Sequence, residues 1–172
     1  FKCDFCDIII TDGRVPRTKD VAHVIKEIEA VKAVGGKHIS FSDANLIGNM
    51  RYAEELLIAV TEFGRTNGYP INFSGEMTIN VAEKPRLLQL FHDANFTSMF
   101  LGIESPRVSS LTETQKRQNT HQPLMKSIRT IQSHNMAILA GMIVGFDNDD
   151  KDIFREQFDF LQEAGIAFTT SG

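Results

Sequence analysis

Short runs of β-forming residues alternate along the chain with longer stretches in which apolar residues recur at helical spacing. Residues 18–34 carry valines and isoleucines on one helical face and are followed by Gly35-Gly36, a pair that favours a helix end. The pattern predicts four further helices: about 51–66, about 83–95, one with Pro123 in its first turn, and one opened by Asp149-Asp150. It predicts strands at residues 38–42, 71–77, 97–103, 136–146 and 166–170.

Two further expectations come from the same pattern. Residues 107–121 are polar, and we expect them to be irregular. Phenylalanines that recur at helical spacing are expected in the core, namely Phe63, Phe91, Phe154 and Phe158.

The strand–helix alternation repeats every roughly 30 residues, close to the ~31 residues per unit of an eightfold βα barrel. Strands joined by helical crossovers run parallel, with right-handed connections. An open doubly wound sheet and part of a βα barrel are both compatible with this pattern. In either architecture we expect the chemistry in the loops after the strands, which begin here near Ser42, Glu76, Glu104 and Gly145.

The composition narrows the class of protein. A chain of 172 residues is long enough for one domain with a core and short for two. A net charge of −4 argues against nucleic-acid binding, and no apolar run approaches the ~20 residues of a membrane-spanning helix. Two cysteines cannot form a disulfide framework, so we expect a reducing cytoplasm. The abrupt start at Phe1 suggests a piece of a longer protein.

The cysteines lie three positions apart in Lys2-Cys3-Asp4-Phe5-Cys6-Asp7. Asp4-Phe5 is a poor match to the small or proline residues expected between the cysteines of a redox dithiol. A structural zinc site needs two further ligands, and the histidines are scattered. An iron–sulfur cluster with another cysteine before Phe1 is the third interpretation. The cysteine pair alone leaves all three open.

This segment resembles the last two-thirds of the radical S-adenosylmethionine (SAM) signature, Cys-x3-Cys-x-aromatic-Cys, with Phe5 as the aromatic residue. Residues 41–45 and 102–105 are similar to family motifs that follow two of the strands. Residues 141–148 resemble the pattern Gly-x-Ile-x-Gly-x-x-Glu, with Asn148 in place of the glutamate. The resemblance covers nearly the whole chain.

The resemblance implies a fold and a site. The α/β fold would be a partial TIM-like (β/α)6 radical SAM barrel with parallel strands and outer helices, lacking its first strand and its terminal unit. One core domain would span residues 1–172, with a cluster loop at 1–17 and βα units at 18–172. Cys3 and Cys6 would bind a [4Fe–4S] cluster, shielded by Phe5. The other residues expected to contact SAM or line its pocket are Ser42, Asp43, Glu76, Glu104, Ser105, Lys116, Gly141, Ile143, Gly145 and Asn148, whereas Asn45 is expected only to form a turn.

More narrowly, CDFCDI, FSDANLIGN and GIESP are similar to cobalamin-linked radical SAM proteins that include hopanoid C-2 methylases. This implies reductive cleavage of SAM to a 5′-deoxyadenosyl radical and cobalamin-dependent methyl transfer to a lipid-like carbon. Cobalamin would be bound by a domain outside this chain. The implied partners are a small-molecule or lipid-like substrate and an electron donor such as a flavodoxin or ferredoxin. The alternatives are another radical SAM reaction (methylthiotransferase or dehydrogenase), or a non-catalytic βα domain with a zinc or redox cysteine pair.

Overall fold

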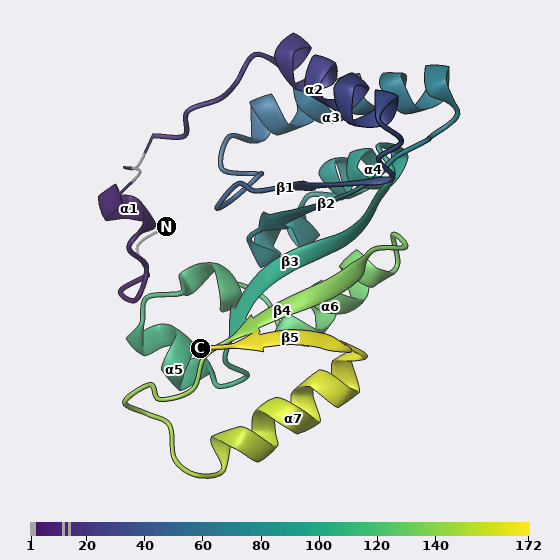
Figure 1. The fold of residues 1–172 in the computed structure, drawn as a ribbon. Helices are drawn as coiled ribbons and strands as arrows, with labels where there is room; N and C mark the ends of the chain where they lie inside the picture. Colours follow the sequence, from purple (N-terminus) through teal and green to yellow (C-terminus); the bar gives the residue numbers. More distant parts are fainter. Residues whose placement is uncertain (1–2, 12, 14) are drawn as a thin grey trace.

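A parallel β-sheet forms the centre of the computed structural model, which describes residues 3–11, 13 and 15–172 (Figure 1). Its strands follow one another in chain order: β1 (His38–Phe41), β2 (Asn72–Met77), β3 (Phe96–Glu104), β4 (Ala137–Met142) and β5 (Phe168–Ser171). All neighbouring pairs are parallel. A doubly wound sheet reverses its strand order at a switch point, whereas a barrel does not. The predicted parallel α/β fold is therefore confirmed, and the strand order is that of a barrel.

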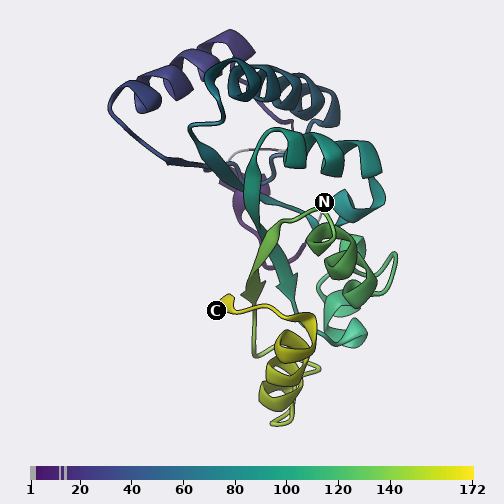
Figure 2. The same cartoon turned by 90° about the vertical axis from the view of Figure 1, so that its right-hand side faces the viewer.

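The helices form an outer arc on one side of the sheet, as Figures 1 and 2 show. The longer ones are α2 (Val21–Ala33), α3 (Met50–Asn67), α4 (Pro85–Asp93), α6 (Leu124–Gln132) and α7 (Ile153–Ala164). The shorter helical segments are α1 (Ile8–Thr11), η1 (Ile79–Glu83), α5 (Val108–Glu113) and η2 (Arg117–Asn119). None of the helices in the described residues combines the length and the apolar run that a membrane crossing requires.

Local sequence explains where the helices begin and end. The side chain of Asp20 accepts a hydrogen bond from the backbone N–H of His23 and caps α2. Asn49 caps α3 in the same way. Helix α3 ends at Gly68, whose φ of 71° is in the left-handed region that glycine adopts without steric cost.

The two faces of the sheet differ in chemistry. The outer face carries fully buried residues such as Met99, Leu101 and Ile103 of β3, which pack in one core with the helices. Most residues of the inner face are half-buried or exposed, although Gly141 is buried. Strand pairing places its residues in rows across the sheet: Ser40, Ser74 and Ser98 in one row, Glu76, Phe100 and Leu139 in the next, and Gly102 and Gly141 nearest the carboxyl ends. This inner face is the one available to a ligand.

Some local predictions were wrong. Phe154 and Phe158 are 66% and 61% exposed instead of buried, because α7 turns Ile153, Gln157 and Ala164 inward and leaves the two rings on its flank. Helix α7 begins at Ile153 and not at Asp149, since the residues before it form a turn. Residues 107–121 contain α5 and η2 and are not irregular.

The strand predicted at 136–146 ends at Met142. Of the loop predicted over residues 1–17, residues 1, 2, 12 and 14 lie outside the described part of the chain.

Leu57→Ala tests the predicted core. Leu57 of α3 is 1% exposed, whereas its neighbour Ile58 is 50% exposed. We expect Leu57→Ala to lower the free energy of unfolding by about 2–5 kcal/mol, because a buried cavity forms. Ile58→Ala, the matched control, should change it by less than about 0.5 kcal/mol. Urea denaturation followed by circular dichroism measures both, and equal losses would contradict the assignment of the helix face.

Candidate functional site

Residues 3–7, here named the cysteine loop, lie near the carboxyl ends of the strands (Figure 1). Cys3 is buried and Cys6 half-buried, and both thiols are free. The backbone N–H of Asp4 donates to the carbonyl of Thr114 at 3.1 Å, and the amide of Gln115 donates to the Asp4 carboxylate at 3.0 Å. The cysteine loop therefore packs on the α5–η2 segment. This is the segment that was predicted to be irregular.

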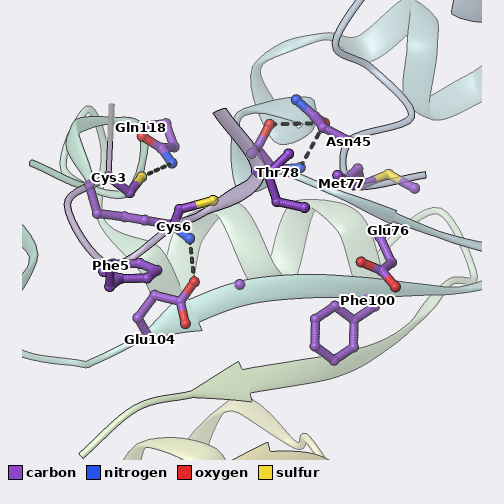
Figure 3. A pocket seen from close by; sticks show the side chains of 14 residues that line it. Cys3, Phe5, Cys6, Asn45, Glu76, Met77, Thr78, Phe100, Glu104 and Gln118 are labelled. Atoms are coloured by element: carbon purple, nitrogen blue, oxygen red, sulfur yellow. Dashed lines mark hydrogen bonds and ion pairs between the residues drawn. The ribbon is translucent and has the colours of Figure 1, made fainter. Parts of the chain in front are cut away.

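The cysteine loop forms one wall of a cavity of about 330 Å³. The inner face of β2 and β3, the β1–α3 loop and η2 form the other walls. Figure 3 shows the Cys3 sulfur beside Gln118, with Cys6 between that side and the Asn45–Thr78 side. The lining residues are Cys3, Phe5, Cys6, Ile8, Ala44, Asn45, Glu76, Met77, Thr78, Phe100, Gly102, Glu104, Lys116 and Gln118.

A buried ion pair joins Glu104 to Lys116 at the end of β3. Glu104 has a φ of 66°, a left-handed conformation that few non-glycine residues adopt, at an irregularity in the pairing of β3 with β4. A Cβ on Gly102 would lie 2.8 Å from Lys116 Nζ, so a larger residue there would displace the pair. Lys116 Nζ also lies 5.4 Å from the centroid of the Phe5 ring. The site thus presents one cation and one anion side by side, away from bulk water.

The amides of η2 complete this wall. Asn119 Nδ2 donates to the carbonyls of Gly102 and Ile103 at 3.0 and 2.9 Å, which fixes η2 to β3. Gln118 Nε2 donates to Cys3 Sγ at 3.4 Å. The oxygens Gln118 Oε1 and Asn119 Oδ1 are buried without a partner among the described residues.

Six of the predicted site residues line the cavity: Cys3, Phe5, Cys6, Glu76, Glu104 and Lys116. Ser42 and Asp43 are exposed on the β1–α3 loop, just before the lining residue Ala44. Ser105 is fully buried, and its Oγ accepts from the backbone N–H of Arg107 at 3.2 Å. The structure does not bring Ser42, Asp43 or Ser105 to the cavity wall.

The four predicted residues of the β4–α7 region also lie off the cavity wall. Gly141 is beside Gly102 on the inner face, where a Cβ would lie 3.0 Å from the Phe100 ring. Ile143 donates its backbone N–H to the carbonyl of Glu104 at 2.8 Å. Gly145 has a φ of 99° in the turn that follows. The side-chain amide of Asn148 donates to Glu113.

Sequence reasoning missed several lining residues. Asn45 does more than form a turn, because its Oδ1 accepts from the backbone N–H of Thr78 at 3.3 Å and joins two walls of the cavity. Gln118 was missed because its segment was treated as an irregular loop. The run Gln115-Lys116-Arg117-Gln118-Asn119, rich in amides around the predicted Lys116, was the available signal.

An arginine clamp holds the β4–α7 loop over α5. Arg107, a largely buried side chain, donates to Glu156 through two N–H groups at 2.6 and 2.8 Å and to Asp150 at 2.7 Å. These hydrogen bonds hold the pKa of both carboxyl groups below its usual value and raise the pKa of Arg107. The loop in turn places Phe146 against Phe5, with ring centroids 6.0 Å apart. The clamp therefore supports the cysteine loop from the side opposite β1 and β2.

The fold and the site define a barrel-type parallel α/β domain with a cysteine pair at the carboxyl edge of its sheet. The profile of the Radical SAM superfamily matches residues 1–161, and the chain belongs to this superfamily, as its motifs predicted.

Two curated relatives match almost the whole chain. The hopanoid C-2 methylase of Rhodopseudomonas palustris (strain TIE-1) is 32% identical over 171 residues, which are 99% of this chain and 32% of that protein. An uncharacterized methyltransferase of Synechocystis sp. (strain ATCC 27184 / PCC 6803 / Kazusa) is 34% identical over the same shares. The chain thus spans about a third of the length of these relatives.

Solved structures share the fold. The radical SAM methyltransferase TsrM from Kitasatospora setae, with cobalamin and a [4Fe–4S] cluster bound, superposes with a TM-score of 0.76 at 13% identity, covering 90% of this chain and 31% of TsrM. The cobalamin-dependent SAM radical enzyme OxsB, with aqua-cobalamin bound, gives a TM-score of 0.68 at 19% identity, covering 93% and 24%. These similarities confirm the predicted fold.

Breaking the buried ion pair should destabilise the protein strongly. Glu104→Gln or Lys116→Met leaves one charge buried without its partner, and each should lower the free energy of unfolding by about 3–5 kcal/mol. The double variant has no unpaired charge, so its loss should be smaller than the sum. Lys19→Met is the control, because Lys19 and Glu27 form an exposed pair worth about 0–1 kcal/mol. Additive losses in a urea double-mutant cycle would contradict the pairing.

The arginine clamp should make stability depend on pH. Because Arg107 lowers the pKa of Glu156 and Asp150, the ionised carboxylates stabilise the folded state above their ordinary pKa values. This contribution is lost as the pH falls through those values and below them. We expect Arg107→Gln to lower the Tm at neutral pH, with a difference from wild type that shrinks from about pH 5 downward. Arg86→Gln, at an exposed pair with Glu54, should keep the wild-type profile. A Tm difference for Arg107→Gln that is constant with pH would be inconsistent with the clamp.

Proposed function

We propose that this chain is the core of a radical SAM enzyme that binds a [4Fe–4S] cluster at Cys3 and Cys6 and SAM in the adjoining cavity. The observation that carries the proposal is the convergence of both thiols and the buried Glu104–Lys116 pair on one cavity. The proposed core domain spans residues 1–172, with the cluster loop at its start. The free thiols suit a reducing compartment, and we place the protein in the cytoplasm.

The donor set fits an iron–sulfur cluster. Both thiols are free and lie on the cavity wall, and thiolates are ligands of iron–sulfur clusters and of zinc alike. The membership of the chain in the Radical SAM superfamily favours the cluster. The third cluster ligand would be a cysteine four positions before Cys3, as the family signature has it.

The residues around the ion pair fit the amino-acid end of SAM. A ligand with an ammonium and a carboxylate group could exchange partners with Glu104 and Lys116, so that each buried charge stays compensated. Gly102 and Gly141, adjacent on the inner face, leave room beside the Phe100 ring. The cavity volume of about 330 Å³ is within the ~300–1,000 Å³ of small-molecule sites.

When bound, the reduced cluster would supply the one electron that cleaves the sulfonium carbon–sulfur bond of SAM, which gives methionine and a 5′-deoxyadenosyl radical. The chain's own residues would bind and orient SAM. Lys116 would hold the SAM carboxylate, and Glu104 the ammonium group or a ribose hydroxyl. Phe5 and Phe100 exclude water with apolar surface, which protects a reactive species from side reactions. The other predicted SAM-contact residues, in the β1–α3 loop, at Ser105 and in the β4–α7 region, would act from just beyond the cavity wall.

For the whole protein we propose cobalamin-dependent methyl transfer to an unactivated carbon of a lipid-like substrate. Two relatives at 32% and 34% identity are named a methylase and a methyltransferase, and the solved structures with this fold include cobalamin-linked enzymes. Cobalamin would be bound by a domain outside this chain, and a flavodoxin or ferredoxin would donate the electron. A second candidate is methylthio transfer, since a tRNA-2-methylthio-N(6)-dimethylallyladenosine synthase of Thermotoga petrophila is 21% identical over 94% of this chain.

Cysteine substitution tests the cluster assignment. In the full-length protein, reconstituted anaerobically with iron and sulfide, Cys3→Ala and Cys6→Ala should each abolish the visible thiolate-to-iron absorption and SAM cleavage. The physical reason is that a cluster left with two thiolates is no longer held. Asp7→Asn, an exposed neighbour of Cys6, is the control and should retain both. A double alanine variant that keeps cluster and SAM cleavage would overturn the proposed function, and one equivalent of zinc without iron would favour the non-catalytic alternative.

A further inference from the structure

Gln118 has a buried side-chain amide, whose N–H end has a hydrogen-bond partner and whose carbonyl end has none among the described residues. It is 4% exposed in η2 and lines the cavity. Its Nε2 donates to Cys3 Sγ at 3.4 Å, while its Oε1 is buried without a partner among the described residues (Figure 3). The residue thus contacts the proposed cluster ligand through its N–H end, while its carbonyl oxygen has no surface open to the cavity.

The chemistry of the two neighbours fixes the direction of the amide. A cysteine sulfur that binds iron is a thiolate, which accepts hydrogen bonds and donates none. The N–H end of Gln118 therefore faces Cys3, and the carbonyl oxygen must face away. A buried acceptor without a donor costs free energy, so the N–H···S hydrogen bond is kept at a cost at the other end of the same side chain.

The position of Gln118 does not depend on the cysteine loop alone. Its neighbour Asn119 is fixed to β3 by two hydrogen bonds, to Gly102 and Ile103. On the other side, Lys116 is held by Glu104 and by its own backbone N–H, which donates to the Leu111 carbonyl at 2.8 Å. The amide is therefore held by the sheet and is preorganised toward the Cys3 sulfur.

We propose that Gln118 is a positioning residue that sets the reduction potential of the cluster through Cys3. Its N–H···S hydrogen bond to Cys3 stabilises the more negative, reduced cluster and so raises the reduction potential. This inference rests on the proposed function, but assigns to Gln118 a role that the cysteines and the ion pair do not have.

The test compares Gln118→Met with Gln115→Met in the full-length, cluster-loaded protein. Gln115 is the matched control, because it is an exposed amide of the same segment that donates to Asp4 and not to a sulfur. Redox titration followed by electron paramagnetic resonance measures the potential. Gln118→Met should lower the ratio of reduced to oxidised cluster about tenfold at a fixed applied potential, which corresponds to a reduction potential about 59 mV lower for one electron. Gln115→Met should leave the reduction potential unchanged.

Gln118→Glu is the second variant, because it keeps the size and an acceptor oxygen of the native side chain. Its carboxylate repels the reduced cluster, so its potential should lie below that of Gln118→Met. A wild-type reduction potential in either variant with full iron content would overturn the proposal. Loss of the cluster from both variants would make Gln118 a structural residue and overturn it too. Absence of a cluster or of SAM cleavage in the wild-type protein would instead refute the proposed function, and the inference with it.

Discussion

Glu104 and Lys116 lie out of water at the end of β3, and neither charge is stable there without the other. This requirement ties η2 to the central strand of the sheet, and η2 in turn holds the cysteine loop through Gln118 and Cys3. The left-handed backbone at Glu104 and the missing side chain at Gly102 make room for the pair. One ion pair therefore connects the sheet, the segment after it and the cysteine loop, and the cavity exists because all three meet.

Much of the fold could be predicted from periodicity, because the outer faces of β2, β3 and β4 bury apolar residues in one core with the longer helices. Periodicity could not decide between a barrel and a doubly wound sheet, because that choice depends on which strands pair with one another. Helix α7 shows that periodicity also did not identify which face of a helix is buried. Phe154 and Phe158 are at helical spacing, yet a stripe one position away, which includes the polar Gln157, is the buried one.

Site residues that belong to a sequence motif could be predicted. Site residues that reach the cavity only because of tertiary packing could not. The cysteine pair, Glu104 and Lys116 were available from family motifs and proved to line one cavity. Asn45 and Gln118 have common polar side chains in loops, and only the folded chain shows that they join the cavity walls. By contrast, Asn148 has its amide engaged with Glu113, which lies far from it in the sequence, so no local pattern could reveal that contact.

The central claim is that cluster, SAM and ion pair share one cavity. Electron–nuclear double resonance on the reduced full-length protein tests it most directly, with SAM carrying ¹³C in its methyl group. The account predicts a resolved coupling between the methyl ¹³C and the cluster spin, because a ligand held by Glu104 and Lys116 lies beside Cys3 and Cys6. SAM shown to be bound by dialysis, but without any such coupling, would place the two groups apart and contradict the account.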